Sequence, residues 1–155
     1  MKKSIITLLL IIGIIAYFFI NQSNNTIDVE LRDFAIEDTS SITKIYLADR
    51  RGNEATVERT DKGWMVDGEY AVRKDALKTA LSTIKNIAVK HPVSDVMHNR
   101  IIKNLATSAV KVEIYTDNPN KAYKTYYVGG ENADMIGSFM LIENSSRAFV
   151  VYIPG

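Results

Sequence analysis

Three side chains that could bind a metal ion lie close together in the sequence. His91, Asp95 and His98 offer two imidazoles and a carboxylate, which are groups that zinc accepts as ligands. However, Pro92 separates His91 from the helix expected to carry the other two, and the two histidines do not have the i, i+4 spacing of a helical zinc motif. The sequence therefore favours surface or capping roles, and we predict no metal and no other cofactor.

A second candidate site is a group of carboxylates around Trp64 and Tyr70, made up of Asp61, Asp67, Glu69 and Asp75. A pair of carboxyls about 5–10 Å apart beside an aromatic ring could hydrolyse a glycosidic bond. Asp is also common in turns and at helix starts for purely structural reasons. A glycan- or peptide-binding domain, or a hydrolase with its site near Trp64, is therefore our alternative hypothesis.

The remaining motifs do not match known catalytic patterns. Gly129-Gly130 is not followed by Gly-Lys-Ser/Thr, as a phosphate-binding loop requires, and Ser40-Ser41 lacks the G-x-S-x-G context of a hydrolase nucleophile. The chain has no Cys, which excludes disulfides, thiolate catalysis and Cys-bound metal. We predict a protein that is not an enzyme.

Tyrosines are concentrated in the second half of the chain, at positions 115, 123, 126 and 127. Tyrosine is enriched in protein interfaces because its ring is apolar and its tip is polar. If Tyr115 and Tyr126 lie on the outer face of adjacent strands, they form an exposed aromatic patch. We predict that these two residues and Trp64 contribute to an interaction surface, while strand propensity alone would also explain the tyrosines.

The N-terminus predicts where these groups are located. Residues 4–20 carry no charge and follow Lys2 and Lys3. A helix over this run would reach across a bilayer core, with the lysines in the cytoplasm by the positive-inside rule. We expect a membrane anchor at 1–20, a polar stalk at 21–32 and a domain at 33–155 outside the cytoplasm.

A cleaved signal peptide is the alternative reading of this run. Signal peptides share the basic start and the apolar stretch, but they end in a cleavage site with small residues. Here the stretch is followed by Asn-Gln-Ser-Asn-Asn at 21–25, and a lipoprotein would need a Cys. Both readings export the remainder of the chain, and we predict a single-pass protein of a bacterial cytoplasmic (inner) membrane.

The periodicity of the exported part predicts an α+β fold of the order βββ-αα-ββββ. Residues 45–47, 55–57 and 64–66 alternate as a β-meander with polar turns between them. Apolar residues then recur at spacings of three and four over 76–87 and again over 97–105, which indicates two helices. A second antiparallel block follows at 110–115, 123–127, 138–143 and 148–153.

The last two strands are apolar on both faces, so we expect both faces to be covered. The chain ends at Pro154-Gly155 directly after an apolar strand, and we therefore expect the domain at 33–155 to be truncated at its C-terminus. The formal net charge is only +1, and no basic stripe is present, so we predict no nucleic-acid partner.

Several short stretches carry a resemblance to a known family: FAIED (34–38), GW (63–64), DAL (75–77), STI (82–84), VKHPV (89–93), KVEIY (111–115) and YYVGG (126–130). In this order they resemble a bacterial domain-of-unknown-function family of single-pass envelope proteins. Its members are often encoded beside subunits of gliding-motility-type ABC transporters. The resemblance implies a setting in the envelope and implies no catalytic residues.

These observations together predict an anchored, non-enzymatic envelope module. We expect it to contact membrane lipid through the N-terminal segment and to dock to an envelope protein partner, such as an ABC-transporter-type or gliding-type complex.

Overall fold

The computed structural model describes residues 33–155 of the chain. The anchor predicted at 1–20 and the stalk predicted at 21–32 lie outside the described residues. Within 33–155, no helix is both long enough and apolar enough to cross a membrane.

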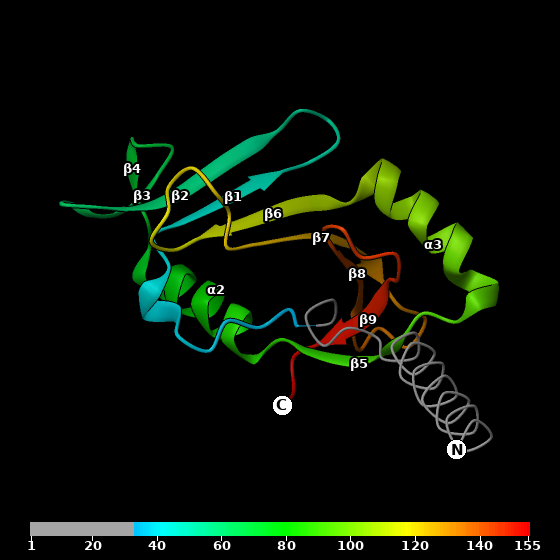
Figure 1. Ribbon diagram of the computed structural model, residues 1–155. Coiled ribbons are helices and arrows are strands. Elements are labelled where there is room, and N and C mark those ends of the chain that lie inside the picture. The colour runs from blue at the N-terminus through cyan, green and yellow to red at the C-terminus, as the bar shows by residue number, and fades with distance from the viewer. Residues whose placement is uncertain (1–32) are drawn as a thin grey trace, which may run out of the picture. The chain divides into compact units, whose positions relative to one another are not determined.

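The described part of the chain is built on one antiparallel sheet of 9 strands in the order β4-β3-β2-β1-β6-β7-β8-β9-β5 (Figure 1). Its strands are β1 (Lys44–Ala48), β2 (Glu54–Thr60), β3 (Gly63–Val66), β4 (Tyr70–Ala71), β5 (Ala88–Pro92), β6 (Val110–Tyr115), β7 (Lys124–Glu131), β8 (Ser138–Ile142) and β9 (Phe149–Tyr152). The helices are a 3₁₀ turn, η2 (Thr39–Ser41), and two α-helices, α2 (Lys74–Asn86) and α3 (Asp95–Ser108).

The predicted order βββ-αα-ββββ is wrong, although the α+β class is right. The short strand β4 follows β3, and β5 lies between the two α-helices rather than in a loop. β5 pairs with β9 through Val89 and Val151, and it forms the edge of the sheet. Pro92 stands at the end of this edge strand, where a missing N–H group is tolerated. The two predicted β blocks are therefore parts of one sheet.

The two blocks join where β1 pairs with β6. Ile45 lies opposite Ile114, and Leu47 lies opposite Val112. Ile114 is fully buried and Ile45 is 6% exposed. Because directly opposed residues of an antiparallel pair lie on the same face, these four side chains share one face of the sheet. We call it the inner face.

Helix α2 and the segment before β1 pack against the inner face (Figure 1). Ile84 is the buried residue of α2, and Leu81 and Ile87 pack beside it. Phe34 is 1% exposed, and its ring makes edge contacts with Tyr126 at 5.9 Å and Phe149 at 6.2 Å between centroids. Through these ring contacts, the segment that begins near Phe34 packs against β7 and β9.

Helix α3 covers the opposite, outer face over β7 and β8. Ile101 and Leu105 of α3 pack with Phe139 and Leu141 of β8. A Cβ atom at Gly129 would come within 2.5 Å of the Leu105 side chain, so glycine lets the helix approach β7 closely. The predicted cover on both faces of the last strands is confirmed.

The sheet curls around its inner face. Ile45 of β1 and Val151 of β9 line the same cavity, although β6, β7 and β8 separate these two strands in the sheet order. Helix α3 contacts β7 and β8, and these contacts do not extend to the outer face of β1 and β6. The fold thus creates two distinct regions: a concave apolar side under α2 and a convex side over β2, β1 and β6.

Candidate functional site

The structure does not bring the predicted metal ligands together. The His91 ring is exposed, with Nδ1 3.0 Å from the carbonyl oxygen of Pro92. Asp95 Oδ1 accepts a hydrogen bond from Arg147 Nη2 at 2.5 Å. His98 Nδ1 is buried and has no hydrogen-bond partner among residues 33–155. No group of three or more potential ligands is found in that same part of the chain.

The carboxylates near Trp64 organise the backbone. Asp67 Oδ1 accepts a hydrogen bond of 2.7 Å from the N–H group of Thr56, and Asp67 itself has a φ of 50° in a tight turn. Asp75 pairs with Arg73 at the start of α2, and this hydrogen bond lowers the pKa of Asp75. Asp67 and Asp75 therefore each have a local structural partner rather than a place in a shared site.

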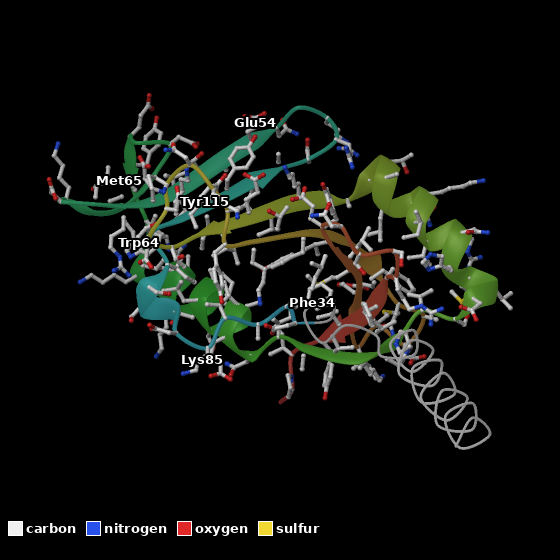
Figure 2. The ribbon with its side chains drawn as sticks, in the orientation of Figure 1. Phe34, Glu54, Trp64, Met65, Lys85 and Tyr115 are labelled. Carbon is white, nitrogen blue, oxygen red and sulfur yellow. The ribbon has the colours of Figure 1, made fainter. Side chains whose placement is uncertain are left out.

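Trp64 lies on the inner side of β3. It pairs with Arg59, whose guanidinium carbon is 5.2 Å from the ring centroid, and it packs against the main core. Figure 2 shows Trp64 and its neighbour Met65 on opposite sides of the strand. Trp64 is not among the residues that line the cavity described below.

Tyr115 and Tyr126 do not form the patch that the sequence predicted. Tyr126 lies opposite Val112 on the inner face and is only 4% exposed. Tyr115 lies opposite Lys44 on the outer face and is partly exposed. The tyrosine of β7 that lies on the outer face is instead Tyr127, opposite Lys111.

Five outer-face residues of β1, β6 and β7 lie around a largely buried carboxylate, Glu113. We call these six residues the tyrosine face: Lys44, Tyr46, Lys111, Glu113, Tyr115 and Tyr127. The Tyr115 hydroxyl donates to Glu113 Oε2 at 2.6 Å, and Lys111 Nζ lies 2.5 Å from Glu113 Oε1. Both carboxylate oxygens of Glu113 therefore have a partner. The Glu113 side chain is only 16% exposed, so these interactions are largely shielded from water.

Cations and hydroxyls extend the tyrosine face around this centre. Lys44 Nζ lies 3.8 Å from the centroid of the Tyr115 ring and donates to the carbonyl of Pro119 at 3.1 Å. The Tyr127 hydroxyl donates to Glu143 Oε1 at 3.3 Å. Figure 2 shows Glu54 and Tyr115 on the side of the sheet opposite α2. The rings of Tyr115 and Tyr127 are therefore held in place by their own neighbours.

The electrostatics of the tyrosine face follow from Glu113. The hydrogen bond from Tyr115 to this carboxylate, helped by burial, raises the pKa of Tyr115 to about 12. Burial alone would raise the pKa of Glu113, but hydrogen bonds from Lys111 and Tyr115 outweigh it and lower this pKa. Glu113 is thus an anion and Tyr115 a neutral donor at physiological pH.

Sequence reasoning missed Tyr46, Lys111, Glu113 and Tyr127. A signal was available, because Lys111, Glu113 and Tyr115 alternate with buried Val112 and Ile114 and must share one face. Tyr126 and Tyr127 are adjacent, so one of them must face inward. Which one does so depends on the register between β6 and β7.

A cavity of about 510 Å³ lies on the inner side of the sheet, beneath α2. It is bounded by β1, β6, β7, β8 and β9, by one side of α2, and by the turn before β8. This cavity is separate from the tyrosine face, because the sheet itself stands between them.

Comparison of the chain with family models, with curated proteins and with solved structures gives no match.

Proposed function

We propose that this protein is a non-enzymatic docking module that binds an envelope protein partner through the tyrosine face. The observation that carries the proposal is the rigid set of partly exposed tyrosines, Tyr46, Tyr115 and Tyr127, held on one side of the sheet around Glu113. Tyrosines fixed in advance lose little conformational entropy on binding and are common binding hot spots.

The chemistry of the tyrosine face fits a protein surface. Lysine and glutamate side chains alternate with aromatic rings, so the face has neither the strong positive charge that nucleic acid selects nor a purely apolar surface. Tyrosine is enriched in the core of protein interfaces, and polar groups are common at their rim.

Two further observations support a role without catalysis. Each of the carboxylates Asp67 and Asp75 is engaged by its own backbone or side-chain neighbour. Trp64, where a glycan or peptide site was the alternative, packs against the core. Neither of these regions presents converging groups for chemistry.

The setting of the proposal comes from the sequence. The uncharged run at 4–20 after Lys2 and Lys3 supports a location at a bacterial cytoplasmic membrane, with the domain outside the cytoplasm. The resemblance to envelope proteins encoded beside gliding-motility-type ABC transporters supports a partner of that class.

Affinity purification of the tagged full chain from detergent-solubilised bacterial membranes tests the proposal. We expect a stoichiometric protein partner with the wild-type chain, and a loss of about tenfold or more in recovery with Tyr115→Ala. Tyr70→Ala is the matched control, because Tyr70 is 68% exposed but lies on β4, away from the tyrosine face.

Two results would contradict the proposal. One is repeated recovery of the wild-type chain alone. The other is full retention of the partner by Tyr115→Ala and by Tyr46→Ala, provided that both variants unfold at the wild-type temperature.

A further inference from the structure

The cavity beneath α2 has the size of a site for a small molecule. Its volume of about 510 Å³ falls within the range of roughly 300–1,000 Å³ that is typical of ligand pockets. The cavity is partly open to solvent. Two isoleucines that line it, Ile136 and Ile153, are 59% and 53% exposed, and they mark its opening to solvent.

The lining selects for an aliphatic ligand. Most of the residues are branched or straight aliphatic side chains from both the sheet and α2: Ile45, Leu47, Ala80, Ile84, Ile87, Val112, Val128, Ile136, Met140, Val151 and Ile153. Among the described residues, none of those lining the cavity carries a charge. A lining of this kind, mostly aliphatic and without charge, favours an apolar ligand.

One hydroxyl group of the cavity wall has no hydrogen-bond partner in the described part of the chain. Tyr126 is 4% exposed, and its hydroxyl makes no hydrogen bond with any residue from 33 to 155. Burial raises the pKa of Tyr126 to about 12, so the phenol stays protonated and can donate. This hydroxyl is therefore free to donate a hydrogen bond to a ligand oxygen in the cavity.

Three more residues with hydroxyl groups line the same space: Thr83 of α2, Ser138 of β8 and Tyr152 of β9. Each of these hydroxyls, like that of Tyr126, can donate a hydrogen bond to a neutral carbonyl oxygen. A charged carboxylate would find no cation there and would be strongly disfavoured by desolvation.

We propose that the cavity beneath α2 binds a single acyl chain, whose carbonyl oxygen accepts a hydrogen bond from Tyr126. The chain could belong to an acyl ester, such as a phospholipid, or to a protonated fatty acid. The absence of a cation among the described lining residues favours the ester. This ligand site faces the opposite side of the sheet from the tyrosine face, so it does not depend on the docking function.

Photo-labelling tests the site. The full chain is placed in phospholipid nanodiscs with one of two probes: a diazirine-bearing fatty acid, or a phosphatidylethanolamine carrying the same diazirine acyl chain. Labelled peptides are then located by mass spectrometry. We expect label on α2, β8 and β9 with at least one probe, and stronger labelling by the phospholipid at neutral pH.

Matched variants make the test specific. Ala80 and Ala76 are both exposed residues of α2, one turn apart, but only Ala80 lines the cavity. Ala80→Trp should therefore remove most of the labelling, and Ala76→Trp should not change it. Thr83→Phe fills the same space and replaces Ala80→Trp if that variant does not fold.

The role of the hydroxyl has its own pair of variants. Tyr126→Phe should weaken labelling about three- to tenfold, as expected for one lost hydrogen bond. Tyr127→Phe should leave labelling unchanged, because Tyr127 lies on the outer face. Label confined to residues 1–32 with both probes, or equal label in Ala80→Trp and Ala76→Trp, would overturn the proposal.

Discussion

The two faces of the central sheet share the same strands but differ in what their side chains do. On β6, Val112 and Ile114 face inward and are 7% and 0% exposed. Lys111, Glu113 and Tyr115 alternate with them on the outer face and pair with one another. The inner face therefore provides most of the stability through burial. Over β1 and β6, away from the cluster under α3, the outer face can carry recognition because its groups contribute less to folding.

The largest expected effect comes from breaking the inner face. Ile114→Ala should lower the free energy of unfolding by about 2–5 kcal/mol, because it leaves a hole in a fully buried position. Lys111→Ala, three residues away on the outer face, should cost less than about 1 kcal/mol. Urea denaturation followed by circular dichroism measures both. Equal losses in the two variants would mean that the faces do not divide stability in this way.

A smaller effect concerns the titration of the outer face. Because Glu113 holds the phenol of Tyr115 in its neutral form, Glu113→Gln should move the pKa of Tyr115 down from about 12 toward its ordinary value of 10. The absorbance of tyrosinate measures this shift, and Tyr115→Phe identifies which transition belongs to Tyr115. The high pKa of Tyr126 arises from burial on the inner face, so it should not respond.

The same shift predicts how stability depends on pH. The pKa of Tyr115 is raised in the folded state, so its contribution to stability is complete below pH 10 and is lost as the pH rises through about 12. In Glu113→Gln this alkaline loss should be smaller than in the wild-type protein. An unchanged alkaline profile would show that Glu113 does not control Tyr115.

The smallest effect is expected at the rim of the tyrosine face. Lys44→Ala removes a cation over the Tyr115 ring and a hydrogen bond to Pro119, and should lower stability by about 0.5–1 kcal/mol. Lys62→Ala, in the exposed turn between β2 and β3, serves as the control. A loss above about 2 kcal/mol would place Lys44 in the stabilising core rather than at a recognition surface.

Part of this architecture was predictable from the sequence because periodicity is a local property. The alternation along β6 and the apolar stripe of α2 both gave the right elements. β5 was missed because Ala88–Pro92 is short and ends in proline, and only its pairing with β9 makes it a strand.

The candidate sites were less predictable because they depend on long-range geometry. The choice between Tyr126 and Tyr127 required the register of β7 against β6, which no local pattern supplies. The cavity forms because the sheet curls and brings β1 and β9 to the same space under α2. Its lining residues range from Ile45 to Ile153, so no local stretch of sequence indicates it.

The most direct test of the docking account is site-specific photo-crosslinking in bacterial membranes. A photoreactive phenylalanine analogue is placed singly at Tyr46, Tyr115, Tyr70 and Tyr123 in the full chain. Tyr70 and Tyr123 are exposed tyrosines outside the tyrosine face. The account predicts that one protein is crosslinked from Tyr46 and from Tyr115, and from neither control position. Crosslinks from Tyr70 or Tyr123 alone, or from none of the four positions, would contradict it.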